Sequence, residues 1–374
     1  MVQHFDPPLT VTRPTLPDFD TYAARLREIW DARWLTNHGP IHGRLEETLR
    51  HVLRAPRVSL FANGTLALEA ALTALGLTGE VITTPFTYVA TANAIKRCGL
   101  EPVFVDVDPL TMTIDPRRVD EAVSHRTSAI LGVHVFGQPC DHGELVRIAD
   151  RHGLALIYDA AHALDLSVGG VPVSTLGDVA MFSLHATKPV QAVEGGVLAF
   201  RDAGLGERLY RFRNHGLAPG GEDVEGIATN AKMSELHALM CLLVLERLGD
   251  VRRRLDVLEA TYRKALEPVA GVVSAVQRQP DVSGYLTFFP VIVNPDEAGF
   301  DRDALQAHLE RHGVLSRRYF SPLISTMPAF ETARRGAMTC ASRLSDRVLA
   351  LPFYADLAPQ DAERVAEIVA SCES

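Results

Sequence analysis

The sequence predicts an α/β protein whose mainly parallel sheet is covered by helices on both faces. Seven short apolar runs carry this prediction: VSLFA (58–62), EVITT (80–84), PVFVDV (102–107), SAILGVHV (128–135), LALIYD (154–159), VAMFSL (179–184) and GVLAF (196–200). The runs are rich in Val, Ile and Phe and are separated by helical stretches, a pattern typical of buried parallel strands. With 374 residues, of which 47% are hydrophobic, the chain is long enough for two domains around a large core.

Helices are expected on either side of the strand-rich region. Residues 18–34 are predicted to form an amphipathic helix after an Asp cap, and residues 42–54 a second one. Residues 233–266 are typical of long helical sequence, because LHALMCLLVLERL carries apolar residues at helical spacing. The segment 217–227 is rich in Gly and acidic residues and is expected to be mobile.

After about residue 270 the pattern changes and indicates a smaller domain of mixed character. A strand pair is expected near 285–294, in YLTFFPVIVN, and helices are expected at 301–311 and 358–371. We therefore predict an N-terminal segment plus a large domain over residues 1–250, and a small α+β domain over residues 251–374.

Composition excludes several classes of partner. The formal net charge of −9 and the pI of about 5.9 disfavour nucleic acid, because an acidic surface repels a phosphate backbone. No basic start followed by an apolar stretch opens the chain, and no run of about 20 apolar residues occurs, so we expect neither a signal peptide nor a membrane span, and a cytoplasmic location. The cysteines are scattered without a CxxC pair, which favours free thiols in a reduced compartment: Cys98, Cys140, Cys241, Cys340 and Cys372.

Metal and dinucleotide sites are not expected. Asp106 and Asp108 lack a partner His or Glu at ligand spacing and are interpreted as the entry to a loop. His134 is interpreted as a core or supporting histidine rather than a ligand. No GxGxxG follows an N-terminal strand, and no GxxxxGK[ST] occurs.

The first candidate binding motif is Asn63-Gly64-Thr65, which lies between a predicted strand and a predicted helix. Unpaired N–H groups and the helix dipole at such a junction favour an anion. The alternative, which this feature alone favours, is a simple helix cap with a Gly turn.

Three polar residues follow the later strands. Asp159 ends LALIYD, where ligands bind in open α/β sheets, although it is equally explained as a helix cap. Ser183 and Lys188 follow VAMFS, and the turn Glu194-Gly195-Gly196 after them allows the chain to pass close to another group. Most lysines are simple surface residues, so Lys188 is a candidate site residue only because of these neighbouring residues.

Tyr88, in PFTYVAT, follows another predicted strand. Its ring is suited to stacking on a planar cofactor, and plain core packing is an equally good explanation.

Together these segments resemble the DegT/DnrJ/EryC/StrS sugar aminotransferases, a family of fold-type I enzymes that use pyridoxal 5′-phosphate (PLP). The resemblance runs over most of the chain and is carried by several blocks in order: WLTNHGPIHGRLE (34–46), NGTLALEAAL (63–72), PFTYVATANAI (85–95), PVFVDVDPLTMTIDP (102–116), VHVFGQPCD (133–141), YDAAHAL (158–164), GDVAMFSLHATKPVQAVEGG (177–196), TNAKMSELHA (229–238) and LPFYADL (351–357). It implies a fold-type I aminotransferase with a large mainly parallel-sheet domain and a smaller C-terminal α+β domain.

The resemblance also implies roles for individual residues. Lys188 looks like the lysine that binds PLP covalently and then acts as acid and base, and Asp159 looks like the partner of the pyridine nitrogen. Tyr88 would lie against the cofactor face. Gly64, Thr65 and Ser183 look like phosphate binders. Asn230, in TNAKMSE, looks like the residue that the family lends to a neighbouring chain's phosphate, which implies a homodimer with shared active sites.

Two positions depart from the family pattern. His162 stands where the family usually has Gln, so it is expected to contact the cofactor if its ring reaches the same oxygen. Val193 stands where Gly is common, which affects the backbone rather than the chemistry. The apolar helix at 233–248 is expected either to help bury a dimer interface or to be an ordinary core helix.

A closer resemblance, through LTNHGP, FSLHATK, NAKMSE and RRYFSPL, is to enzymes that aminate the 4-keto carbon of dTDP-4-keto-6-deoxyglucose with L-glutamate as donor. Arg317, Arg318 and Tyr319 are then plausible contacts for the nucleotide diphosphate, or else form a solvated basic turn. Amination at C-3 and a non-catalytic PLP-binding regulator stay open as alternatives. A related dehydratase is disfavoured, because those enzymes carry His where this chain has Lys188. The sugar, the stereochemistry of the product and the pathway, whether for a surface glycan or a natural product, are left open by the sequence.

Overall fold

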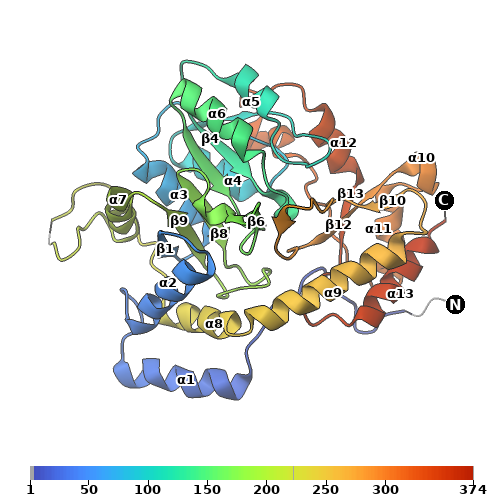
Figure 1. The fold of residues 1–374 in the computed structure, drawn as a ribbon, viewed down its shortest axis with the longest axis horizontal. Coiled ribbons are helices and arrows are strands. Elements are labelled where there is room, and N and C mark those ends of the chain that lie inside the picture. The colour runs from blue at the N-terminus through green and yellow to red at the C-terminus, as the bar shows by residue number, and fades with distance from the viewer. Residues whose placement is uncertain (1–3, 222, 374) are drawn as a thin grey trace.

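The structure of the protein, a computed structural model, describes residues 4–221 and 223–373 and is built around a seven-stranded sheet (Figure 1). The strand order is β1-β9-β8-β5-β4-β2-β3. The strands are β1 (Arg57–Phe61), β2 (Glu80–Thr83), β3 (Glu101–Phe104), β4 (Thr127–Val133), β5 (Ala155–Asp159), β8 (Val179–Ser183) and β9 (Gly196–Phe200). All seven predicted strands are present, and the prediction of a mainly parallel sheet is confirmed, since only β9 runs against its neighbours.

Both faces of this sheet are buried. Successive residues of a strand point to opposite sides, so neighbouring residues report on the two faces. In β4, Ala129 and Leu131 belong to one hydrophobic cluster and Ile130 to the other. The first cluster contains residues of α3 (Gly64–Ala74), α4 (Val89–Arg97), α7 (Ala203–Arg213) and α9 (Leu248–Leu266). The second contains residues of α2 (Pro40–Val52), α5 (Pro116–Ala122), α6 (His142–His152) and α8 (Glu235–Leu245).

The predicted first helix is α1 (Phe19–Ala32), which begins after the side-chain cap of Asp18 and packs along α8 (Figure 1). The long helical segment 233–266 is two helices, because the chain departs from regular helix at Glu246 and Arg247, between α8 and α9. Helix α8 lies between α1, α2 and the sheet, and most of its side chains are buried. Within the chain it is therefore a core helix.

A buried carboxylate joins α8 to α2. Glu235 accepts hydrogen bonds from the backbone N–H groups of Ile41 and His42, both at 2.8 Å, and its backbone N–H donates to the carbonyl of Leu35. Helix α2 has no cap of its own, since its N-cap residue is Gly39. Glu235 thus supplies the cap from a distant part of the chain and fixes the segment that leads into α2.

The C-terminal part contains a small sheet of order β10-β12-β13, with β10 (Val272–Ser274), β12 (Phe289–Val293) and β13 (Val348–Leu351). The predicted strand pair at 285–294 is therefore wrong: this segment holds a single strand, and its partners come from residues far away in sequence. The helices here are α10 (Pro295–Ala298), α11 (Arg302–Arg311), α12 (Thr339–Arg347) and α13 (Pro359–Ala370), so the helices predicted near 301–311 and 358–371 are confirmed. The predicted domain boundary at residue 250 falls within α9 and stays a prediction.

Short elements complete the described chain. A third sheet joins β11 (Val282–Ser283), β6 (Ser167–Val168) and β7 (Val171–Pro172). Single 3₁₀ turns lie at Val135–Gly137, Val173–Thr175, Ile324–Thr326 and Pro328–Phe330. None of the helices in the described ranges is long and apolar enough to cross a membrane.

The N-terminal segment runs over the C-terminal part before α1 begins (Figure 1). The N–H of Phe5 donates to the carbonyl of His312, and the N–H of Leu9 donates to that of Gly313, both at 2.9 Å. Further along, the carbonyl of Val11 accepts from the N–H of Phe353. The start of the chain is thereby tied to residues more than three hundred positions later.

Candidate active site

The carboxyl ends of β1, β5 and β8 meet at one edge of the large sheet. Because β9 is antiparallel to both β1 and β8, these two strands run in the same direction, which β5 shares. In the register of the sheet, Phe61 pairs with Gly196, and Gly196 pairs with Ser183. The residues that follow these strands are therefore brought to the place where open α/β sheets bind ligands.

A cavity of about 210 Å³ lies at this edge, and most of the predicted site residues line it. The nine that do so are Gly64, Thr65, Tyr88, Asp159, His162, Ser183, Lys188, Arg317 and Tyr319. Two predicted residues, Asn230 and Arg318, do not line it. The fold thus gathers residues from five separate segments of the sequence around one space.

Lys188 projects into the cavity from the loop that follows β8. Its backbone N–H donates to the carbonyl of His185, and its Nζ lies 4.9 Å from the centre of the Phe288 ring. Burial lowers the pKa of the Lys188 amine from 10.5 to about 8, against the opposing effect of the negative charge on Asp159. A much larger fraction of this amine is therefore neutral near pH 7 than in an ordinary lysine, as a nucleophile requires.

Asp159, the last residue of β5, is buried in the wall of the same cavity, with 5% of its surface exposed. Its Oδ1 accepts from the N–H of Ala161 at 3.1 Å, and its Oδ2 accepts from the hydroxyl of Thr91 at 2.8 Å. Burial raises the pKa of the Asp159 carboxyl, while these two hydrogen bonds and the charge of Lys188 lower it. Sequence reasoning missed Thr91, which lies three residues after Tyr88, in the first turn of α4.

The N-terminus of α3 forms another part of the wall. The Asn63 side chain caps the N–H of Leu66, and the N–H groups of Gly64 and Thr65 precede it in the first turn. Gly196 of β9 packs directly behind this turn, because a Cβ there would lie 2.5 Å from the carbonyl oxygen of Asn63. The sequence predicted that the turn Glu194-Gly195-Gly196 passes close to another group. In the structure that group is the backbone of the candidate binding motif Asn63-Gly64-Thr65.

His162 is a neutral donor in this arrangement. Its Nδ1 accepts from the N–H of Phe136 at 3.1 Å, so in the neutral ring Nε2 carries the hydrogen. Burial holds the pKa of His162 well below its usual value, and the charge of Lys188 acts in the same direction. The Phe288 ring meets it edge to face, with ring centres 4.9 Å apart.

Arg317, Tyr319 and Tyr88 form the more exposed part of the lining. The Arg317 guanidinium lies 5.4 Å from the centre of the Tyr319 ring, and Tyr88 is 57% exposed. Arg318 instead donates to the Gln306 side chain and pairs with Asp303 of α11 at 3.3 Å. The structure therefore brings Arg317 and Tyr319, but not Arg318, to the cavity.

Asn230 lies three residues after the segment 217–227 and is exposed. Its backbone forms an isolated bridge with Asn214, and its Oδ1 faces the N–H of Lys232 at 3.5 Å. Its predicted role toward a second chain stays a prediction. Residue 222 of the segment lies outside the described residues, and the predicted mobility of the segment is likewise untested.

The residues set aside by sequence reasoning have structural roles. His134 is fully buried, accepts from the N–H of Cys140 through Nδ1 and stacks on Tyr158 with ring centres 4.5 Å apart, so its interpretation as a core residue is confirmed. Asp106 accepts from the N–H groups of Cys340 and Ala341 and thereby caps α12. All five cysteines, each within the described ranges, are free.

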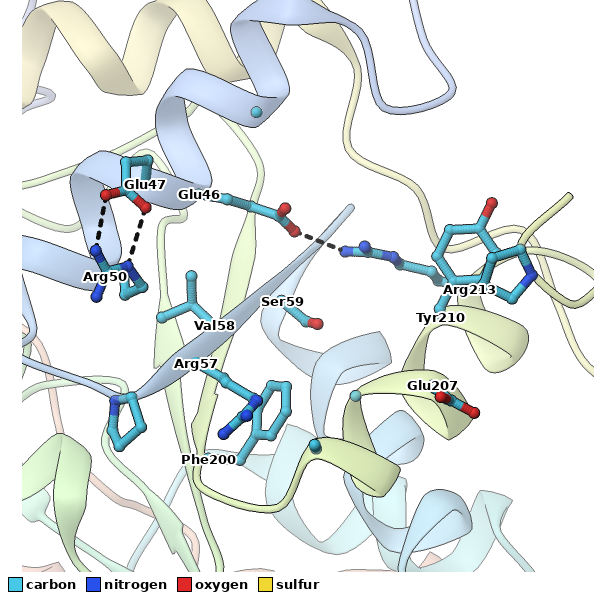
Figure 2. Close-up of a pocket in the computed structure, with 15 residues that line it drawn as sticks. Glu46, Glu47, Arg50, Arg57, Val58, Ser59, Phe200, Glu207, Tyr210 and Arg213 are labelled. Atoms are coloured by element: carbon cyan, nitrogen blue, oxygen red, sulfur yellow. Dashed lines mark hydrogen bonds and ion pairs between the residues drawn. The ribbon is translucent and has the colours of Figure 1, made fainter.

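A second, more open hollow of about 540 Å³ lies between α2, β1 and α7 (Figure 2). Two pairs of its charged side chains interact: Arg50 with Glu47 at 2.7 Å, and Arg213 with Glu46 at 3.3 Å. Arg213 also donates to the carbonyl of Leu60 on the edge strand β1. The contacts of Arg213 link α7 to α2 and to the edge strand, and none of the predicted site residues lies here.

Known proteins share both the sequence pattern and the fold. The model of the DegT/DnrJ/EryC1/StrS aminotransferase family matches residues 19–370. The chain is 36% identical over 366 residues to dTDP-4-amino-4,6-dideoxy-D-glucose transaminase of Shigella dysenteriae (97% of this chain, 98% of the relative), and 38% identical over 357 residues to the Escherichia coli protein of that name (94% and 95%). It also superposes on the crystal structure of DesI, solved in the presence of its TDP-sugar product, with a TM-score of 0.94 at 38% identity, covering 99% of this chain and 94% of DesI.

Proposed function

The chain belongs to the DegT/DnrJ/EryC1/StrS aminotransferase family, and from this we propose that it moves an amino group from L-glutamate to the C-4 ketone of dTDP-4-keto-6-deoxy-D-glucose. The product would be the 4-amino-4,6-dideoxy sugar nucleotide. One observation carries the proposal: a lysine whose pKa is lowered to about 8 and a buried carboxylate line one cavity, next to a helix N-terminus.

The groups around the cavity fit PLP as the cofactor. A neutral amine at Lys188 suits the aldehyde of PLP, and the acceptor Asp159 suits its protonated ring nitrogen. The N–H groups at the start of α3 suit its phosphate, and Gly64 lets this turn pack against Met181, because a Cβ at this position would lie 3.2 Å from the Met181 sulfur. When bound, PLP supplies a carbonyl that captures amines and an electron-poor ring that stabilises negative charge on the neighbouring carbon.

In this mechanism the residues of the chain have separate tasks. The Lys188 amine holds the cofactor and, once released, moves a proton at Nζ between the two carbons that change oxidation state. Asp159 holds the positive charge of the ring nitrogen in place. The Ser183 hydroxyl and the first turn of α3, with Gly64 and Thr65, bind the phosphate. The His162 Nε2–H donates to an oxygen of the ring.

At the substrate end, Arg317 and Tyr319 are proposed to hold the sugar nucleotide. A guanidinium pairs with a diphosphate through parallel hydrogen bonds, and the stacked Tyr319 ring limits the positions that Arg317 can adopt. Tyr88 would lie against the cofactor ring. Arg318 is engaged with α11 and is proposed to support this segment rather than to contact the substrate.

A direct assay tests the proposal. The protein, loaded with PLP, is incubated with L-glutamate and either a 4-keto or a 3-keto sugar nucleotide, 2-oxoglutarate is measured, and the product is identified by NMR. We expect 2-oxoglutarate with the 4-keto substrate and none with Lys188→Ala, whereas Lys264→Ala, at an exposed lysine of α9, keeps full activity. Product only from the 3-keto substrate would move the amination to C-3. PLP binding without turnover of either sugar would favour a regulator.

We also propose that the protein acts as a homodimer in which Asn230 serves the phosphate site of the partner. The exposed position of Asn230, outside the cavity of its own chain, supports this arrangement. Mixing the inactive variants Lys188→Ala and Asn230→Ala should then restore about a quarter of the wild-type activity, because half of the dimers are hybrids with one intact site each. Failure of the mixture to regain activity, with hybrids verified by mass spectrometry, would refute the shared site.

A further inference from the structure

A chain of two buried hydroxyl groups ends on the Asp159 carboxylate. The Thr91 hydroxyl donates to Oδ2 of Asp159 at 2.8 Å, and the hydroxyl groups of Thr87 and Thr91 lie 3.0 Å apart. Thr91 is 0% exposed and Thr87 is 3% exposed. Solvent therefore cannot replace either hydrogen bond without a rearrangement of the fold.

The direction of these hydrogen bonds follows from the charge on Asp159. An ionised carboxylate only accepts, so Thr91 must use its single hydroxyl hydrogen toward Oδ2. The Thr91 oxygen is then free to accept the hydrogen of Thr87. The ionised carboxylate thus orients both hydroxyl groups, and each donor in turn strengthens the next.

The local sequence explains why Thr91 can reach Asp159. Thr91 is the third residue of α4, which begins after Tyr88 at the same edge of the sheet where β5 ends. Oδ1 is occupied by the N–H of Ala161, so Thr91 supplies the one hydrogen bond to Oδ2 from the described residues. Lys188 contributes the charge that favours ionisation, and the exposed side chains of Arg317 and Glu194 line the same cavity.

We propose that Thr91 is a positioning residue which, backed by Thr87, keeps the Asp159 carboxylate ionised and fixed in orientation so that it can hold a protonated ring nitrogen. This inference rests on the proposed function, because it concerns the partner of the PLP ring. Hydrogen bonds to the charged form of a buried acid favour that form, and burial alone would disfavour it. Removal of the Thr91 hydroxyl should therefore weaken the positive charge on the ring nitrogen without touching any group that contacts the substrate.

Matched variants separate the hydroxyl from the packing of the side chain. Thr91→Val keeps the shape and removes the hydroxyl, Thr91→Ser keeps the hydroxyl and removes the methyl group, and Thr87→Val removes the outer donor. Each variant is checked for folding by circular dichroism and thermal melting, then loaded with PLP that carries ¹⁵N in the ring. The ¹⁵N chemical shift across a pH series reports protonation of the ring nitrogen independently of turnover.

The expected results are ordered by distance from Asp159. In Thr91→Val the ring nitrogen should lose its proton about one to two pH units lower than in the wild type, with a fall of about 10- to 100-fold in kcat and little change in KM for L-glutamate. Thr91→Ser should stay close to the wild type, and Thr87→Val should show a smaller shift in the same direction. Should Thr91→Val fail to fold, Thr87→Val carries the test.

Two outcomes would overturn the inference. One is a folded, PLP-loaded Thr91→Val (or, if that variant does not fold, Thr87→Val) whose ring nitrogen titrates as in the wild type. The other is Thr91→Ser falling as far as Thr91→Val, which would assign the effect to packing. A wild-type protein that binds no PLP would instead refute the proposed function itself, and the inference with it, whereas either of the two outcomes above would refute the inference alone.

Discussion

The lowered pKa of Lys188 should be visible as chemical reactivity in the protein freed of PLP. The chain has four lysines, Lys96, Lys188, Lys232 and Lys264, so each can be followed on its own peptide. Formaldehyde with a borohydride reductant methylates neutral amines and is small enough to enter a cavity of about 210 Å³. The rate of methylation of Lys188, measured by mass spectrometry against pH, therefore reports the neutral fraction of its amine.

The size of the effect follows from the pKa. A fall from 10.5 to about 8 leaves roughly one amine in ten neutral at pH 7, which is about 300-fold more than for an ordinary lysine. The rate at Lys188 should rise to a plateau with a midpoint near pH 8. Lys264, exposed on α9, serves as the control within the same sample.

The variant Asp159→Asn tests the direction in which the Asp159 charge shifts the pKa of Lys188. The negative charge of Asp159 raises the pKa of Lys188 against the larger effect of burial, so its removal should move the midpoint below 8. The same lysine also couples the free energy of unfolding to pH, because its pKa is lower in the folded than in the unfolded chain. The folded state should therefore gain stability from about pH 8 to about 10.5, and Lys188→Met should abolish this gain. Identical pH profiles for Lys188 and Lys264, or an upward shift in Asp159→Asn, would refute the reasoning.

Three further predictions concern the framework of the site. Glu235→Ala leaves two buried N–H groups at the start of α2 without an acceptor and should lower the free energy of unfolding by about 2–4 kcal/mol. An unchanged midpoint in urea titrations would contradict this conclusion. Gly196→Ala places a Cβ 2.5 Å from the Asn63 carbonyl oxygen and should weaken PLP binding about tenfold or more. The control Gly43→Ala, at an open position in α2, should leave PLP binding intact and add about 0.5–1 kcal/mol of stability. Equal PLP dissociation constants in both variants would count against the close approach of Gly196 to Asn63. Val193 has a φ of +65°, which a β-branched residue adopts at a cost, so Val193→Gly should stabilise the protein by about 1 kcal/mol, and a lower melting temperature would disprove this strain.

The large sheet could be predicted because its strands are short, buried on both faces and rich in β-branched residues, so each run of sequence carried its own signal. The positions of Lys188 and Asp159 at one edge could be predicted for a related reason, because Asp159 ends one such run, Lys188 lies in the loop after another, and the ends of parallel strands share an edge, whereas their roles came from the resemblance. The small sheet could not be predicted in the same way. Residues 289–293 do form a strand, but its partners lie at 272–274 and 348–351, and no local pattern encodes pairing over such distances.

Thr91 and Glu235 were missed because their roles depend on contacts between distant elements. A threonine in the first turn of a helix and a glutamate at the start of another are ordinary residues in sequence. Only the packing of α4 beside β5 gives the Thr91 hydroxyl its carboxylate, and only the packing of α8 on α2 gives Glu235 its two donors. Conversely, the resemblance implied a substrate role for Arg318, which the structure instead engages with Gln306.

The tie between the first residues and the C-terminal part affects how the protein is made. His4 contacts Arg311 across 307 positions of sequence, and Phe5 and Leu9 find their acceptors beside it. At about 5–20 residues per second, a ribosome needs roughly 15–60 s to deliver those acceptors after the N-terminus has been synthesised. The strands of the large sheet are all synthesised before that interval ends, since the last of them ends at Phe200, while the leading segment still has no partner and is exposed to chaperones and proteases.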